Sequence, residues 1–441
     1  MPPYGPSVRV LRAPGFAWLL LGQAMSAIGN WVAVIAIWGF ASFRFDASAA
    51  DLALLFVVLA VPGAVLGPLV GVAIDRLGPR RSLAVANVLG ALDALALSQV
   101  DSYLAIVALA LPLGLIEATA SASLDALPPR IVADEDLVRA NALLGSAQDL
   151  ALVVGPVVAA AVNSVWGLAG AFAADAASFA VALATVAALP RDLGAAAPGE
   201  PRSPAPPPDP GDPRASEMAL GAPVAPVELG SPRAWAETRQ GLALARSSPQ
   251  LRWLLGLSLL TVLVWGTFGV VEPLYVRDVL GASDNTFAYL QAVFGGGLLG
   301  AGAILTAAGD RAARPRLVAA ATVASGAGAV LYVGTGQLAV AYAGVFLWGL
   351  ATALVLVPVK TLLQRWTPRA AHGRILALHE SVEPSGNLVS TPLAALVVGG
   401  IGVQPAGVVG GLVLVAGGLL AARMTARFAG TGPSAGGPLR P

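Results

Sequence analysis

The sequence predicts an all-α integral membrane protein whose twelve transmembrane helices form two six-helix halves. Of its 441 residues, 56% are hydrophobic and only 12% are charged, whereas roughly a quarter of the residues of a soluble domain are charged. The chain contains twelve apolar runs, each close to the ~20 residues that a helix needs to cross a bilayer. One long polar insert separates the first six runs from the last six, which predicts the two halves.

The first half, 1–189, contains six apolar runs bounded by glycine, proline or charged residues. Each run predicts one membrane-spanning helix, and six spans return the chain to the side on which it started. The first run follows Arg9 and Arg12 and is longer than a signal-peptide core, so we expect it to be retained as the first span. The predicted spans are 15–41, 51–74, 82–100, 103–126, 140–162 and 165–189.

The insert, 190–250, is rich in proline and alanine and predicts a cytoplasmic linker, because such a composition buries too little apolar surface to fold. Its last part combines basic residues with apolar residues at helical spacing, which predicts a short amphipathic helix. We expect the second half to occupy 251–428 and residues 429–441 to form a disordered tail. The predicted spans of the second half are 251–274, 286–308, 316–336, 338–364, 374–399 and 404–427.

Lysine and arginine residues predict the orientation, because cytoplasmic loops carry an excess of positive charge. If the N-terminus is cytoplasmic, only Arg44 and Arg277 of the 26 lysines and arginines lie in outward loops. If the assignment of loops to the two sides of the membrane is shifted by one helix, this asymmetry of positive charge is lost. We therefore expect a multi-pass protein of the cytoplasmic (inner or plasma) membrane with both termini in the cytoplasm.

Composition argues against several classes of function. The net charge of +1 provides no basic surface for nucleic acid, and the absence of cysteine excludes thiolate metal sites and thiol nucleophiles. The two histidines, His372 and His379, have no convincing set of metal ligands. The only lysine, Lys360, is not preceded by the glycines of a phosphate-binding loop, so ATP-driven transport is unsupported. We expect no enzyme activity, no metal and no cofactor.

The loop after the second span has a pattern of small, acidic and basic residues that resembles the loop signature of the major facilitator superfamily. The glycines permit close helix approach and a tight turn, and the acid can pair with arginine and face a helix N-terminus. In that family this loop latches the two halves together on the cytoplasmic side. The alternative is an ordinary charged hairpin. The residues are Gly67, Gly71, Asp75, Arg76, Gly78, Arg80 and Arg81.

The corresponding loop of the second half contains Gly309, Asp310 and Arg311. Two six-helix halves with matching loops are typical of the parallel repeats of this family. The resemblance covers nearly the whole chain and implies a major facilitator fold that works by alternating access. We expect the protein to be a monomer.

Within the superfamily, the chain most resembles the branch of macrolide and siderophore (enterobactin-type) exporters. Leu127 to Leu143 looks like the loop between spans four and five of that branch, and Leu363 to Arg374 looks like its counterpart between spans ten and eleven. Span five also has the exporter pair Gly155 and Pro156. However, alanines replace other glycines of that motif, and span four lacks the arginine of many proton antiporters, so direction and coupling stay open.

Acidic residues inside spans are candidates for carrying protons, because a charge inside the bilayer costs several kcal/mol. Glu117 leads, since the family fold places span four on the central cavity. Its alternative role is a structural hydrogen bond, and for Asp93 and Asp175 on peripheral spans we favour such interhelical bonds. Lys360 either pairs with Glu380 or extends to the headgroups. The proton-coupling candidates are Glu117, Glu383, Glu380 and Asp149.

A few polar and aromatic residues in spans one and seven are candidates for lining the substrate cavity: Gln23, Asn30, Trp31 and Trp265. Such a lining suits a small amphipathic organic molecule. The predicted function is therefore proton-coupled efflux of such a molecule, drug-, macrolide- or siderophore-like, with the substrate, protons and the lipid bilayer as partners. The alternatives are an uptake carrier and a non-transporting scaffold or receptor of the same fold.

Overall fold

The computed structural model describes residues 6–190, 232–368 and 371–428, and all of their regular secondary structure is helical. The predicted all-α membrane fold is confirmed: ten helices in the described residues are long and apolar enough to cross a membrane. The chain divides into two compact units, unit 1 with Met1–Ser231 and Asp284–Ala292, and unit 2 with Pro232–Ser283 and Val293–Pro441. Most of the predicted linker and the predicted tail lie outside the described residues.

Unit 1 begins with a short helix, α1, and continues with long helices that start at clear sequence signals. Ser48 caps α3, where its hydroxyl accepts a hydrogen bond from Asp51 N and the Asp51 carboxylate accepts one from Ser48 N. Pro79 begins α4 at a position where no backbone donor is lost. The helices are α1 Pro6–Leu11, α2 Phe16–Gly39, η1 Phe40–Arg44, α3 Ala49–Leu77, α4 Pro79–Leu97, α5 Tyr103–Asp125, α6 Pro128–Ile131, η2 Asp134–Asp136 and α7 Leu137–Ala187.

Unit 2 contains the remaining helices, except that the first turns of α11 group with unit 1. Helix α9 lies at the end of the predicted linker and packs against α14 and α10. The helices are α9 Pro232–Ser247, α10 Pro249–Leu274, η3 Tyr275–Val279, α11 Asp284–Ala308, η4 Gly309–Arg311, α12 Pro315–Val333, α13 Leu338–Trp366, α14 His372–Ile401 and α15 Val403–Phe428.

Two features explain why ten apolar helices correspond to twelve predicted spans. Helix α7 contains both spans five and six and is broken at Gly167, whose φ of 67° and ψ of −176° are not helical. Helix α4, which contains Arg80, Arg81 and Asp93, is not among the ten apolar helices. All twelve predicted runs therefore lie in helices.

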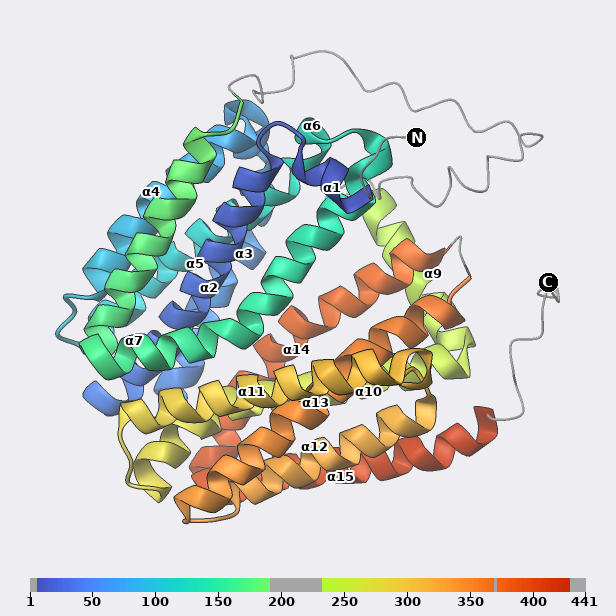
Figure 1. Cartoon of the computed structure of the whole chain (residues 1–441). Coiled ribbons are helices and arrows are strands. Elements are labelled where there is room, and N and C mark those ends of the chain that lie inside the picture. The colour runs from blue at the N-terminus through green and yellow to red at the C-terminus, as the bar shows by residue number, and fades with distance from the viewer. Residues whose placement is uncertain (1–5, 191–231, 369–370, 429–441) are drawn as a thin grey trace, which may run out of the picture. The chain divides into compact units, whose positions relative to one another are not determined.

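The two units repeat the same local geometry at one constant offset in residue number. Asp46 and Gly281 both have left-handed backbone, with φ of 53° and 57°, and each follows a π-helix, η1 or η3. Gly167 and Gly402 mark corresponding breaks. The helix pairs match as well: α4 packs on α5 and α7 in unit 1, as α12 packs on α13 and α15 in unit 2 (Figure 1). The predicted internal repeat is thus visible in the backbone.

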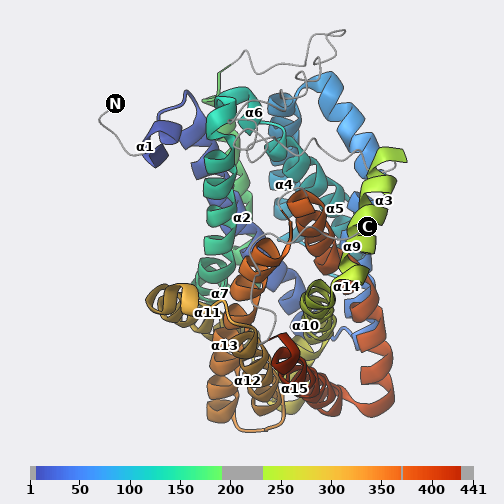
Figure 2. The same cartoon turned by 90° about the vertical axis from the view of Figure 1, so that its right-hand side faces the viewer.

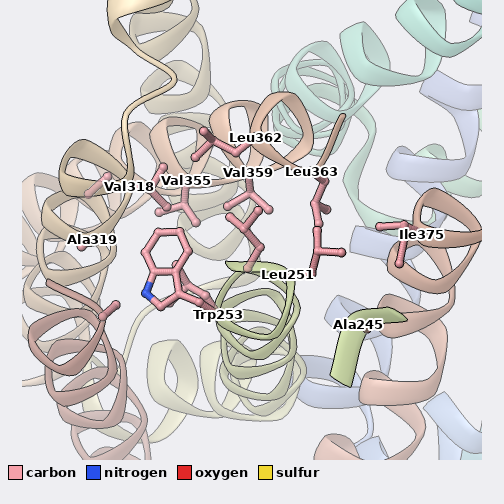
Figure 3. Packing of buried hydrophobic residues seen from close by; sticks show 14 residues of the cluster. Ala245, Leu251, Trp253, Val318, Ala319, Val355, Val359, Leu362, Leu363 and Ile375 are labelled. Atoms are coloured by element: carbon pink, nitrogen blue, oxygen red, sulfur yellow. The ribbon is translucent and has the colours of Figure 1, made fainter. Parts of the chain in front are cut away.

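The interior of unit 2 is apolar where α9 joins the bundle. Trp253 on α10 packs among aliphatic side chains of α12 and α13 (Figure 3). Ala245 on α9 and Ile375 on α14 belong to the same cluster, and Arg374 Nη1 donates a hydrogen bond of 2.8 Å to Gln240 Oε1. Helix α9 is therefore part of the packed unit.

Candidate functional site

Three acidic side chains from three helices converge inside unit 1: Asp93 on α4, Glu117 on α5 and Asp175 on α7. Asp93 and Asp175 are only 7% and 2% exposed, and Glu117 is half-buried. Glu117 lies close enough to Asp93 for an electrostatic interaction, and Asp175 interacts with both. Within the described part of the chain, none of the three forms an ion pair with lysine or arginine. We call these residues the acid cluster.

Small residues on α2 make room for the acid cluster. A Cβ atom at Gly29 would come within 2.7 Å of Asp175 Oδ1, so the carboxyl group lies against the backbone of α2. Ser178 Oγ is 3.3 Å from the same oxygen and 2.8 Å from the backbone carbonyl oxygen of Asp175, to which it donates. Asp93 Oδ2 is buried without a hydrogen-bond partner among the described residues. The cluster is therefore only partly satisfied by the protein.

A small cavity with a partly polar lining lies in unit 1 among α2, α4, α5 and α7. Gln23, Ser26, Asn87 and Thr185 provide its polar lining, and the rest is aliphatic. Gln23 lines this small cavity, which is formed by helices of one unit. Its predicted place in the lining of a central substrate cavity stays a prediction.

Gly155 and Pro156 of span five lie against span one. A Cβ atom at Gly155 would clash with the Trp31 side chain, so the absence of a side chain there admits the indole. In unit 2 the residue without a side chain is on the other helix. Gly266 on α10 corresponds to Trp31 and faces Ser390 on α14, which corresponds to Gly155. Trp31 thus has a packing role beside Gly155 and Pro156. Asn30 and Trp265, the other cavity candidates, are half-buried.

The remaining acid candidates are exposed side chains of their units. Glu380 Oε1 lies 3.1 Å from Lys360 Nζ, so the pairing alternative for this lysine is the one observed. Glu383 and Asp149 are exposed on α14 and α7. Burial therefore distinguishes the acid cluster from these three.

The glycines of the loop signature make no close contact within unit 1. A Cβ atom at Gly67 or Gly71 would meet nothing within 4 Å among the described residues, and the close approach of these glycines to another helix stays a prediction. The close contact of α3 within unit 1 is made where Gly114 of α5 meets the carbonyl of Leu59. Glycine permits such contact but does not require it, so a glycine pair alone does not fix the crossing point.

Among the charged residues of the signature, Arg80 contacts the end of α7. Arg80 Nε and Nη2 donate hydrogen bonds of 3.3 and 3.2 Å to the carbonyls of Val186 and Ala187, where a cation also complements the helix dipole. Gly78 has a φ of 83°, as the predicted turn requires. Asp75, Arg76 and Arg81 are exposed, and no ion pair of Asp75 is found among the described residues, so its pairing with arginine stays a prediction. In the second-half loop Gly309 has a φ of 52° and Arg311 is exposed, while the Asp310 side chain lies outside the description.

The sequence analysis missed Glu272, which is 7% exposed at the end of α10. It lies in electrostatic contact with the fully buried Tyr332. A signal was present, since Glu272 is the only acid in the predicted span 251–274. Asp93 and Asp175 were recognised, but their convergence with Glu117 was not.

Comparisons with known proteins agree with this architecture. The family model of the Major Facilitator Superfamily matches residues 19–309 and 254–436. The uncharacterised MFS-type transporter YfiS of Bacillus subtilis (strain 168) is 39% identical over 62 residues, and this match spans only 15% of its length and 14% of the chain.

Solved transporter structures resemble the chain over almost its full length. A bacterial homologue of the human lysosomal transporter Spinster, in an inward-facing and unoccupied conformation, has a TM-score of 0.64 at 15% identity, covering 94% of this chain and 96% of its own. The nucleoside transporter NupG has a TM-score of 0.62 at 11% identity, with coverages of 95% and 100%. At these identities the likeness shows the fold alone.

Proposed function

Because the chain belongs to the Major Facilitator Superfamily of membrane transporters, we propose that it is a secondary active carrier that exports a small amphipathic molecule in exchange for protons. The six-helix bundles 1–189 and 251–428 move relative to each other and expose one substrate site alternately to the two sides. Residues 190–250 form the cytoplasmic linker, both termini lie in the cytoplasm, and one chain is the transporting unit.

The acid cluster is the observation that carries the proton-coupled part of this proposal. A buried carboxylate without a cation or a full set of hydrogen-bond donors is costly. Binding a proton removes that charge, so the occupancy of the site by a proton depends on how much water reaches it. Glu117 is the proposed exchanging acid, because it is the least buried of the three and interacts with Asp93.

The exporter-like span five supports the direction. Gly155 and Pro156 are present. Of the alanines at the other motif positions, Ala151, Ala159 and Ala160 are at most 4% exposed and stay closely packed, whereas Ala142 is exposed. The half-buried tryptophans Trp31 and Trp265, among few polar side chains, support an amphipathic substrate. An uptake carrier would share all of these features except the motif.

The test is substrate-dependent proton movement in inside-out vesicles that contain the full chain. Macrolides, siderophores and amphipathic drugs are added in turn, and the internal pH is followed with a fluorescent dye. We expect at least one compound to release protons from energised wild-type vesicles, and Glu117→Gln to lose this response. Asp101→Asn, an equivalent change at an exposed loop acid, is the matched control and should respond like the wild type.

The other outcomes separate the alternatives. Retention of the response in Glu117→Gln would move the coupling role to Glu383, Glu380 or Asp149. No response to any compound, with the protein folded and bound to a panel member, would favour an uncoupled carrier or a receptor.

A further inference from the structure

The polar cavity of unit 1 has the chemistry of a water site. Gln23 is 8% exposed, and its Oε1 atom has no hydrogen-bond partner among the described residues. Asn87 is 2% exposed and uses Nδ2 to donate to Leu83 O at 2.8 Å, and Thr185 Oγ1 donates to Ala182 O at 2.7 Å. Gln23 Oε1 is therefore a buried acceptor that is available to a bound water. A buried water typically needs 2–4 such polar partners, which this lining provides.

The cavity and the acid cluster are built on the same helices. Helix α4 carries Asn87 and Asp93, and α7 carries Thr185 and Asp175. At a rise of about 1.5 Å per residue, these pairs are separated by roughly 9 and 15 Å along their helices. On α5 the cavity residue Ala120 follows Glu117 by less than one turn. The cavity and the acid cluster are therefore separated by less than one turn on α5 and by roughly two to three turns on α4 and α7.

The cavity lies toward one face of the unit. Its residues come from the first halves of α2 and α4 and from the last halves of α5 and α7. Because consecutive spans run in opposite directions, these four ends lie on the same side, the predicted cytoplasmic side. The acid cluster lies deeper on the same helices.

A seam of small and hydroxylated residues between α2 and α7 connects the two. Gly22 faces Thr185, and Gly29 faces Ser178 and Asp175. Ser26 lies between the two glycines in sequence and lines the cavity. A Cβ atom at Gly22 would clash with Thr185 and one at Gly29 with Ser178, so the two helices are in direct contact here. Hydroxyl groups, which can pass on a proton through hydrogen bonds, therefore lie between the cavity and the acid cluster in place of an open passage.

We propose that the cavity of Gln23, Ser26, Asn87 and Thr185 holds water that carries protons between the cytoplasmic face and the acid cluster, through the interior of unit 1. In this step a proton leaves a hydronium ion, binds a carboxylate oxygen and leaves a neutral water behind, and the reverse step restores the carboxylate. The role in transport rests on the proposed proton coupling, whereas the water route itself does not.

The route can be tested without a substrate. The full chain is reconstituted in lipid, and the C=O band of protonated carboxyl groups is followed by infrared spectroscopy after transfer to deuterated water. Loss of band intensity in Glu117→Gln, Asp93→Asn and Asp175→Asn assigns the band to the acid cluster. Asn87→Leu and Gln23→Leu leave these acids in place and make the cavity apolar, so we expect deuterium exchange of the band to slow at least tenfold.

Controls make the test decisive. Thr322→Val in unit 2 removes a buried hydroxyl that donates to Val318 O, and it should leave the exchange rate unchanged. Thr185→Val is the milder cavity variant if the leucine variants do not fold, with an expected slowing of about threefold.

An unchanged rate in the folded cavity variants would overturn the route, as would the absence of a cluster band at any pH. Slowed exchange without any substrate-dependent proton movement would support the route and contradict antiport. Substrate-dependent proton movement with unchanged exchange would contradict the route alone.

Discussion

Single glycines set how closely helices approach within each unit. Gly114 on α5 meets the carbonyl of Leu59 on α3, and Gly349 on α13 meets the carbonyl of Phe294 on α11 at the corresponding place of unit 2. A methyl group at either position would press on backbone atoms that no side-chain rotation can move. These two glycines are therefore required by the packing within their units.

Gly114→Ala is expected to destabilise the protein by about 1–3 kcal/mol, the range for an overpacked contact. The measurement is the thermal unfolding midpoint of the purified protein in detergent. Gly256→Ala on α10 is the control, since a Cβ atom there meets nothing within 4 Å. A midpoint equal to that of the wild type would contradict the close packing of α3 on α5.

At the residue scale the sequence predicted the type of site but not its assembly. Glu117, Asp93 and Asp175 could be identified as acids at spanning depth, because the cost of a bilayer charge is independent of the fold. That the three meet depends on the rotation of α4, α5 and α7 about their axes. All-round apolar helices contain little information on that rotation.

Among the elements, α1 is attached to unit 1 by one ion network and one apolar contact. Arg9 Nη2 lies 2.8 Å from Asp136 Oδ1 and 3.0 Å from Glu135 Oε1, and Arg139 Nη1 is 2.8 Å from the same Asp136 oxygen. Val10 packs into a buried cluster with Phe16 of α2. The hydrogen bond from Arg9 holds the pKa of Asp136 below its usual value.

This network predicts a pH dependence. Since the folded protein lowers the pKa of Asp136, the stabilisation is complete above the unfolded value of about 4 and is lost as the pH falls through the folded value below it. We expect the unfolding midpoints of wild type and Asp136→Asn to differ by a constant amount from about pH 8 to 5 and to converge at lower pH. Glu135→Gln, at a 68% exposed side chain, should differ little from wild type throughout. A difference that persists in acid would contradict the ion pairing.

Helix α7 shows both the strength and the limit of prediction at the element scale. Its two spans, 140–162 and 165–189, were predicted from two apolar runs, but the observed break at Gly167 lies just inside the second predicted span. However, a continuous helix with a single non-helical residue is not distinguishable from two separate spans by hydropathy. The break follows from backbone geometry that only glycine adopts easily.

Gly167→Ala should therefore cost about 1–3 kcal/mol, because an alanine at φ of 67° and ψ of −176° is strained. Gly145→Ala on the same helix is the matched control, since its surroundings are open. Unfolding midpoints of the two variants, measured together, test the prediction. A Gly167→Ala midpoint no lower than that of Gly145→Ala would show that the break does not need glycine.

In the whole molecule, a comparison of corresponding residues in the two units shows which features the shared fold requires. The left-handed positions, the π-helices and the glycine contacts recur in both units. The acids do not recur: at the same offset Glu117 corresponds to Thr352 and Asp175 to Gly410. A shared fold that forms without these carboxyls in unit 2 does not require them in unit 1, which supports a specific role for the acid cluster.

The proposed orientation in the membrane can be tested by labelling single introduced cysteines, because the chain contains no cysteine of its own. Single cysteines can be placed at exposed loop positions of either half, Gln99 and Gln337 on the predicted outer side and Glu135 on the inner side. With both termini in the cytoplasm, a membrane-impermeant maleimide should label Gln99→Cys and Gln337→Cys in intact cells, and Glu135→Cys only after lysis. The same-side labelling of Gln99→Cys and Gln337→Cys reports the parallel repeat, and which side they share reports the orientation. The reverse pattern would place the polar cavity at the outer face, and the proton route inferred for unit 1 would then open to the exterior.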